Sequence, residues 1–149
     1  MELLFRSSLN APPAVVWLWA TSSKGVNGEL MPLLRMRGLK PFEALRDADP
    51  VLGVPLGTCW LLLFGVLPVD RVLLTPVAFE AGRHFAEESP MWSLRRWRHE
   101  RTVRPEGEGT LIEDRLNFEA RVFGPATKYF VRFLFTHRHR QLRRHFNGE

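Results

Sequence analysis

The sequence predicts an α+β fold in which a strongly curved, seven-stranded antiparallel sheet wraps around a long C-terminal helix. From residue 58 onward, apolar or alternating runs are separated at short intervals by Pro, Gly, Asp and Ser, which is typical of strands joined by hairpins. From Pro125 the apolar residues recur with the period of a helix. Two helical segments follow the first β-prone run, so two short helices are expected between the first and second strands.

The first strand and the first helix follow directly from residue types. Residues 2–9 form an apolar, β-prone run that stops at Asn10. The next stretch, APPAVVWLWATS, begins with Pro12 and Pro13, and proline suits the first turn of a helix. A strand followed by a helix therefore opens the domain.

The segment up to residue 57 contains less regular signals. Residues 25–30 predict a second short helix before Pro32, and residues 33–39 predict a second strand. Residues 40–57 mix proline, glycine and charge, which predicts a long loop. Such a loop serves either as a lid over a binding site or as a disordered surface segment.

Five further strands are expected before the C-terminal helix, and the short loops between them force antiparallel neighbours. Their predicted ranges are 58–66, 70–79, 83–89, 94–103 and 110–119. A bent sheet that grips a helix leaves a hollow between the two, and apolar hollows of this type bind small molecules.

The composition indicates one domain, residues 1–149, with a single core. The chain is 45% hydrophobic, and a domain of this size buries roughly two thirds of its unfolded surface. The formal net charge is +5, which attracts anions weakly and specifies no function. Cys59 is alone in the sequence, so an internal disulfide is excluded, and its apolar surroundings predict a buried thiol in a reducing compartment.

A cytoplasmic location without stable membrane insertion is expected. The first residues, MELLFRSSLNAPP, lack the basic and apolar regions of a signal peptide. The longest strongly apolar run, residues 60–67, is far shorter than the roughly 20 residues that cross a bilayer.

The C-terminal helix is expected to be apolar on one wide face and basic on the other. At about 100° per residue, the inward direction collects Phe123, Ala126, Phe130, Phe133, Leu134 and His137, and an adjoining arc collects Val131, Phe135, Leu142 and Phe146. The opposite, solvated side collects Lys128, Arg132, His139, Arg140 and Arg143, while the flanks carry Arg138, Arg144 and His145. We interpret His137 as a hydrogen-bonded core residue or as a ligand contact. No two of the five histidines are four residues apart, so neither a metal nor another cofactor is expected.

Side-chain alternation predicts the inner face of the last three strands. This face collects Phe85, Glu87 and Ser89, then Trp97, His99, Arg101 and Val103, then Ile112, Asp114, Leu116 and Phe118. Hairpin register places Glu87 opposite His99 and Asp114 beside His99 or Arg101. Buried charges need partners, so these groups form either an internal ion-pair network or a site that orients or reacts with a ligand.

The chain resembles the START-like, helix-grip superfamily, often called SRPBCC, which includes polyketide cyclases and dehydrases, coenzyme-Q-binding proteins and lipid-transfer domains. It is similar to the bacterial branch of ligand-binding SRPBCC proteins. The resemblance covers nearly the whole chain, through APPAVVWLWATS, NGELMP, GVLPVD, FAEESP, WRHERTV, GTLIEDRLNFEAR and FTHRHRQLRRHF. It implies a hydrophobic ligand cavity between the sheet and the long helix, but it implies no single activity and no catalytic residue.

Three functions remain open. The first is binding, as a carrier or sensor, of an apolar molecule such as an isoprenoid, a polyketide or a lipid. Its candidate site residues are Phe85, Glu87, Trp97, His99, Arg101, Ile112, Asp114, Leu116, Phe130, Phe133, Leu134 and His137. The second is a cyclase or dehydratase in which His99 moves a proton and Arg101 stabilises an enolate. The third, less favoured, is nucleic-acid or ribosome-surface binding through the basic helix. The oligomeric state stays open.

Overall fold

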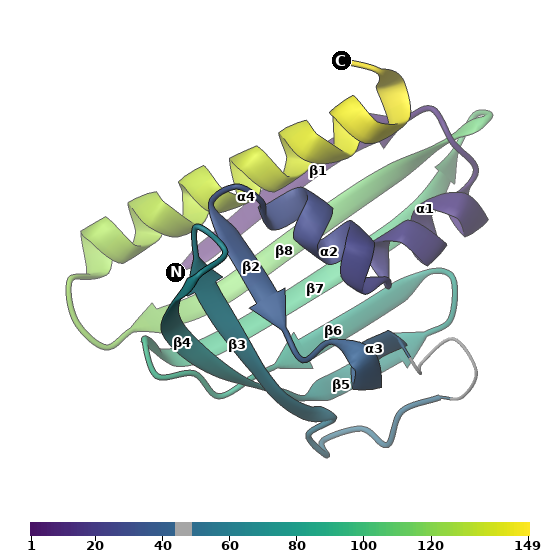
Figure 1. The fold of residues 1–149 in the computed structure, drawn as a ribbon. Helices are drawn as coiled ribbons and strands as arrows, with labels where there is room; N and C mark the ends of the chain where they lie inside the picture. The colour runs from purple at the N-terminus through teal and green to yellow at the C-terminus, as the bar shows by residue number, and fades with distance from the viewer. Residues whose placement is uncertain (44–48) are drawn as a thin grey trace.

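The computed structural model describes residues 1–43 and 49–149. The first half contains β1 (Glu2–Leu9), α1 (Pro13–Ala20), α2 (Ser23–Leu30), β2 (Leu34–Arg37) and α3 (Lys40–Glu43). The second half contains β3 (Gly57–Leu63), β4 (Leu67–Leu74), β5 (Pro76–Glu80), β6 (His84–Glu88), β7 (Leu94–Glu106), β8 (Gly109–Ala120) and α4 (Gly124–Asn147). Figure 1 shows α4 lying along one face of the sheet, with α1 and α2 on the same side. The predicted α+β class and the packing of a long terminal helix on a curved sheet are confirmed.

The strands form two sheets rather than the single seven-stranded sheet that was expected. In the described part of the chain, one sheet has the order β1-β8-β7-β6-β5 and the other has the order β2-β3-β4. The predicted strand 70–79 is in fact β4 and β5, which separate at Thr75. The backbone N–H of Thr75 donates to Ser89 Oγ, and Pro76 has no N–H to offer, so the ladder is interrupted and the chain passes to the other sheet.

The expected loop 40–57 contains a short helix, α3, and turns near its end. The amides of Gly53 and Leu56 donate to the carbonyl oxygens of Pro76 and Leu74, which fastens this end to β5 and β4. Residues 44–48 lie outside the described residues, so the choice between a lid and a disordered loop stays a prediction.

The predicted inner face of the last three strands is confirmed. Glu87 pairs with His99 across β6 and β7, and Arg101 pairs with Asp114 across β7 and β8. All but one of the inward positions are buried, and Glu87 is half-buried. Alternation on β6, β7 and β8 was therefore sufficient to place the polar side chains inside the fold.

The predicted faces of α4 need correction. His139 was assigned to the solvated side but is only 3% exposed, and Arg138, assigned to a flank, is 9% exposed. Phe133 was assigned inward but is 51% exposed. The face that packs on the sheet and α2 consists of Val131, Leu134, Phe135, Arg138, His139 and Leu142. The physical reason is that Arg138 and His139 find carboxylate partners inside the protein.

The rest of the basic ending stays on the surface, as expected. Arg132, Arg140 and Arg144 are exposed. His137 is half-buried, and its Nε2 is 2.8 Å from the carbonyl oxygen of Met31, which links α4 to the end of α2. The nucleic-acid interpretation of this helix stays a prediction.

Asp70 on β4 ties the smaller sheet to the turn between β6 and β7. Its Oδ1 accepts hydrogen bonds from the backbone amides of Arg71 and Trp92 at 2.8 and 2.9 Å. Its Oδ2 accepts from the Ser93 hydroxyl. An isolated bridge between Val72 and Met91 adds a backbone link at the same place.

We expect Asp70→Ala to lower the free energy of unfolding by about 1–2 kcal/mol, because it leaves part-buried donors without their acceptor. Urea unfolding followed by circular dichroism measures the change. Glu80→Ala, which removes an exposed carboxylate paired with Arg83, is the control and should change stability by less than about 0.5 kcal/mol. Equal losses in the two variants would contradict a structural role for Asp70.

Candidate functional site

A cavity of about 550 Å³ lies between α4 and the two sheets. This volume is within the range of small-molecule sites. Its walls come from every layer of the fold and are mostly apolar. They include Val26, Leu30, Leu34, Met36, Leu61, Leu63, Val69, Met91, Leu94, Trp97, Phe123, Ala126, Phe130, Val131, Leu134 and Phe135.

The cavity reaches the surface beside the N-terminal end of α4. Val69, Phe123 and Phe130 line it and are themselves 46%, 80% and 45% exposed. Apolar side chains at a surface opening give an apolar molecule a continuous path from the outside to the interior.

Five of the predicted site residues line this cavity. They are Glu87, Trp97, His99, Phe130 and Leu134. Phe85 and Arg101 instead line a smaller cavity of about 50 Å³, next to the first.

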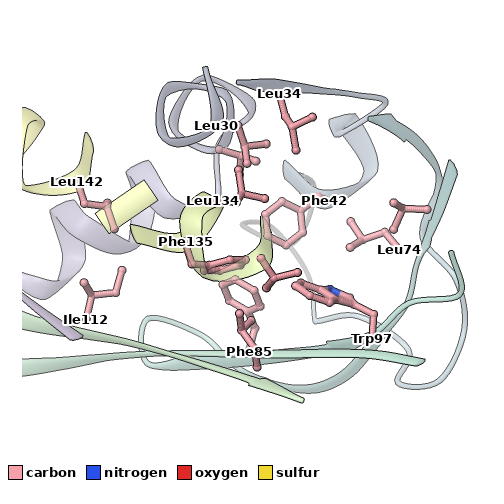
Figure 2. Packing of buried hydrophobic residues seen from close by; sticks show 14 of the residues in the cluster. Leu30, Leu34, Phe42, Leu74, Phe85, Trp97, Ile112, Leu134, Phe135 and Leu142 are labelled. Atoms are coloured by element: carbon pink, nitrogen blue, oxygen red, sulfur yellow. The ribbon is translucent and has the colours of Figure 1, made fainter. Parts of the chain in front are cut away.

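The other predicted residues are outside both cavities. Ile112 and Leu116 are fully buried in packed core, where Leu142 and Phe135 of α4 cover the sheet (Figure 2). Asp114 lies behind His99, in contact with its ring. Phe133 is on the exposed side of α4 and His137 bonds to Met31, so neither lines a cavity.

Three polar side chains stand where the two cavities adjoin. Glu87, His99 and Arg138 line both. Glu87 Oε1 accepts a hydrogen bond of 2.9 Å from the indole of Trp97. This group, the Glu87–His99–Arg138 cluster, is a polar end of the mostly apolar site, and Asp70, Ser93 and Thr127 are the other polar side chains in its lining.

Asp114 on β8 is the centre of a buried ionic network behind the cluster. Its Oδ1 accepts from Arg101 Nε and lies 2.7 Å from His99 Nε2. Its Oδ2 accepts from Arg101 Nη2 at 2.8 Å and lies 2.7 Å from His139 Nε2. A carboxylate has about four lone-pair positions, so these four partners saturate Asp114.

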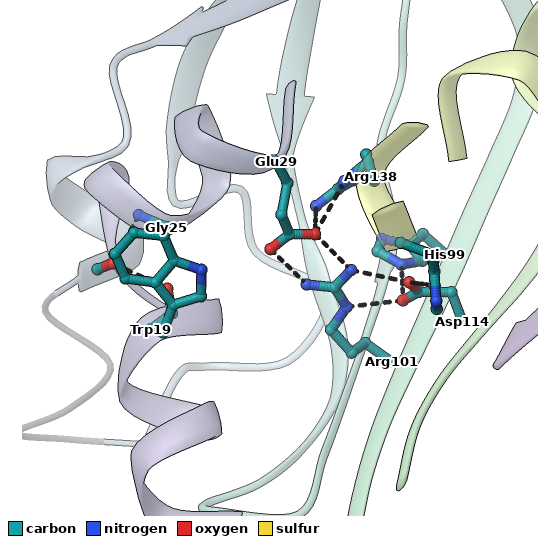
Figure 3. Close-up of polar contacts among 9 residues, drawn as sticks. Trp19, Gly25, Glu29, His99, Arg101, Asp114 and Arg138 are labelled. Carbon is teal, nitrogen blue, oxygen red and sulfur yellow. Dashed lines mark hydrogen bonds and ion pairs between the residues drawn. The ribbon is translucent and has the colours of Figure 1, made fainter. Parts of the chain in front are cut away.

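Glu29 on α2 is the second acid of the network and joins both arginines (Figure 3). Arg101 Nη1 and Nη2 donate to its two oxygens at 3.0 and 2.7 Å. Arg138 Nε donates to Oε1 at 3.2 Å. Arg101 is therefore enclosed between Glu29 and Asp114, and it connects α2 to β7 and β8.

The network keeps its members charged although they are fully buried. Burial raises the pKa of Asp114, but the charge and hydrogen bonds of Arg101, together with His99 and His139, outweigh burial and hold this pKa well below the usual range. Burial likewise raises the pKa of Glu29, and the charges of Arg101 and Arg138 lower it further than burial raises it. Burial lowers the pKa of Arg101, and Asp114 and Glu29 more than reverse this effect.

The network continues from the cavity side to β1. His139 Nδ1 is 2.7 Å from Ser7 Oγ, and Ser7 Oγ accepts a hydrogen bond of 3.0 Å from Arg143. His139 Nε2 donates to Asp114, and in the neutral ring the Ser7 hydroxyl then donates to Nδ1. Each donor in this chain thus has an acceptor.

Sequence reasoning missed Glu29, Arg138, His139 and Ser7. Glu29 did have a signal, because it shares the inner face of α2 with Gly25, Val26 and Leu30. Arg138 and His139 fit the i, i+3, i+4 spacing of Leu134, Phe135 and Leu142, although their charge argues against burial. No feature of the sequence indicated that the Ser7 hydroxyl takes part in hydrogen bonds with α4.

Cys59 is buried, as expected. Burial, with a smaller contribution from the charge of Glu87, raises the pKa of its thiol to about 11. The thiol therefore stays protonated at neutral pH.

Comparisons with known proteins agree on the fold. A family model described as Domain of unknown function (DUF8410) matches residues 7–146. No curated protein matches the chain in sequence. In the described part of the chain, no helix is both long and apolar enough to cross a membrane.

Solved structures extend the likeness over almost the whole chain. A START superfamily protein from Mycobacterium smegmatis has a TM-score of 0.70 at 12% identity, covering 99% of this chain and 97% of its own. Ara h 8.0201 has a TM-score of 0.66 at 10% identity, covering 100% and 99%. DynU16, from the dynemicin biosynthetic locus, has a TM-score of 0.58 at 12% identity, covering 97% of this chain and 48% of its own. At these identities the likeness is one of fold.

We expect the stability of the protein to fall as the pH is lowered below about 4. The pKa of Asp114 is lower in the folded protein than in the unfolded chain. The ionised carboxylate therefore stabilises the fold at any pH above the unfolded-state pKa, and this stabilisation is lost as the pH falls towards the folded-state pKa.

Asp114→Asn should be less stable by about 3–5 kcal/mol at neutral pH, because Arg101 loses a partner. Its stability should also depend less steeply on pH in urea unfolding between pH 7 and pH 2.5.

Glu119→Gln removes an exposed carboxylate from the same strand and is the matched control. It should keep the acid sensitivity of the wild type. A wild-type pH slope in Asp114→Asn would contradict the assignment of acid sensitivity to the network.

Proposed function

We propose that this protein, as a carrier or sensor, binds an apolar small molecule between the sheet and α4. The chain belongs to the family described as Domain of unknown function (DUF8410) and has the START-like, helix-grip fold. The observation that carries this proposal is the 550 Å³ cavity with apolar walls and an opening to the surface. An isoprenoid, polyketide or lipid-like molecule matches such walls.

The hollow contrasts with the rest of the interior. Protein interiors are close-packed, and voids larger than a water molecule lower stability. Around Ile112, Leu116 and Leu142 the core is filled, with each side chain fully buried. A large apolar void beside a filled core is therefore a feature that supports ligand binding, where burial of apolar ligand surface contributes about 25 cal/mol per Å².

We expect Leu134→Trp to reduce binding of the neutral fluorescent probe N-phenyl-1-naphthylamine by tenfold or more, because the larger ring occupies the cavity that Leu134 lines. Fluorescence titration measures the dissociation constant. Thr136→Trp adds the same ring to the exposed side of α4 and should bind the probe like the wild type. The proposal fails if the wild type does not bind the probe, or if the two tryptophan variants bind it equally.

Catalysis by a cyclase or dehydratase mechanism is the second candidate. One observation favours it: His99 lines the cavity, and its Nδ1 has no hydrogen-bond partner among the described residues. Arg101 is enclosed by Glu29 and Asp114, so the guanidinium that faces the main cavity is that of Arg138. In this proposal His99 takes a proton from a carbon next to a carbonyl, and Arg138 stabilises the enolate.

The enzymatic candidate predicts slow dehydration of an aromatic β-hydroxyketone, 4-hydroxy-4-phenylbutan-2-one. His99 Nδ1 removes the α proton, the enone forms, and the β-hydroxyl departs with that proton as water. His99→Gln should lower the rate about a hundredfold or more, measured by the ultraviolet absorbance of the enone. His84→Gln, which changes a histidine outside the two cavities, should keep the wild-type rate. No turnover by the wild type would remove this candidate and leave the binding proposal intact.

A further inference from the structure

We propose that the cavity selects a neutral aromatic molecule bearing a hydroxyl group and discriminates against carboxylates such as fatty acids. The inference rests on the proposed binding function and adds the chemical class of the ligand. It follows from the atoms of the Glu87–His99–Arg138 cluster that have no hydrogen-bond partner within the described part of the protein and so remain available to a ligand.

His99 presents its Nδ1 to the ligand. Asp114 is an ionised carboxylate, so His99 Nε2, 2.7 Å away, must be the donor in their hydrogen bond. In the neutral imidazole the other nitrogen, Nδ1, then carries a lone pair. None of the described residues donates to Nδ1, and the His99 side chain is 6% exposed on the wall of both cavities.

Glu87 presents a second acceptor. Its Oε1 is held by the Trp97 indole at 2.9 Å, which fixes the direction of the carboxylate. Its Oε2 has no donor among the residues that the structure describes. A ligand hydroxyl can donate to either acceptor, whereas a ligand carboxylate has no hydrogen to donate.

The charge around the cavity opposes an anion. The acidic side chains that line it or bond to its lining are Glu29, Asp70, Glu87 and Asp114. The basic side chains around it are Arg138, which lines it, Arg101, which bonds to Glu29 and Asp114, and Arg121, which donates to the carbonyl oxygen of Met91. Four carboxylates against three guanidinium groups give a local formal charge of −1, although the formal charge of the whole chain is +5. Arg138 is already paired with Glu29, so its charge is matched within the protein.

The walls beside the cluster favour an aromatic ligand. Trp97 and Phe135 have ring centroids 6.0 Å apart and both line the cavity. Ring-to-ring contacts add about 0.5–1.5 kcal/mol to the free energy of apolar burial. An aromatic hydroxyl compound therefore matches both the walls and the acceptors.

The test compares three probes of the same ring system: pyrene, 1-hydroxypyrene and 1-pyrenecarboxylate, titrated at neutral pH by fluorescence. We expect 1-hydroxypyrene to bind about tenfold or more tightly than pyrene, because its hydroxyl donates to the cluster. We expect 1-pyrenecarboxylate to bind most weakly of the three. Glu87→Gln keeps an oxygen for the Trp97 indole but removes a charge, so it should tighten 1-pyrenecarboxylate binding about tenfold.

Glu88→Gln is the matched control, because Glu88 is exposed on the outer face of β6 and pairs with Arg98. It should leave all three affinities unchanged. If pyrene binds but 1-hydroxypyrene is no tighter, or the carboxylate is tightest, the ligand class is wrong and the binding function stands. If no probe binds, both proposals fall.

Discussion

The fold depends on holding the charge of Asp114 in the interior. Its four hydrogen bonds come from three residues, His99 and Arg101 on β7 and His139 on α4, and Arg101 extends the contact to Glu29 on α2. A buried ion pair is costly unless its groups are fully bonded, and removing one partner leaves an uncompensated charge. The network therefore fixes the distance of α2 and α4 from the sheet. Because both helices form walls of the cavity, the same interaction sets the shape of the hollow.

The cavity lies where the two sheets separate. At Thr75 and Pro76 the chain leaves the pairing of β4 with β3 and enters the pairing of β5 with β6. On the side of β1 and β8, α4 packs against the sheet and Leu142 is fully buried. Towards the smaller sheet, α4 faces β2, β3 and β4 across the void instead (Figure 1). The smaller sheet, which the sequence did not predict as a separate sheet, thus forms one wall of the cavity.

The inner faces of β6, β7 and β8 were predictable and the faces of α4 were not, for a physical reason. Alternation has a period of two, so one apolar anchor such as Trp97 determines the direction of His99 and Arg101. On α4 the assignment assumed that charge points to water. Arg138 and His139 break that assumption because their partners, Glu29 and Asp114, are 109 and 25 residues away in sequence. Contacts at such separations depend on how α2 is placed against α4, which no local pattern contains. The cavity itself was expected from the resemblance, but its acidic lining depends on the same distant contacts.

Stability and ligand chemistry are coupled in this arrangement. Asp114 holds the Nε2 proton of His99, so the bracing contact decides that Nδ1 is the nitrogen left for the ligand, and in the neutral ring this nitrogen is an acceptor. A substitution at Asp114 changes the fold and the hydrogen-bonding role of His99 together. Glu87 is different, because it bonds to Trp97 and to no member of the Asp114 network among the described residues. Ligand preference can therefore change through the half-buried Glu87 while the Asp114 network remains intact.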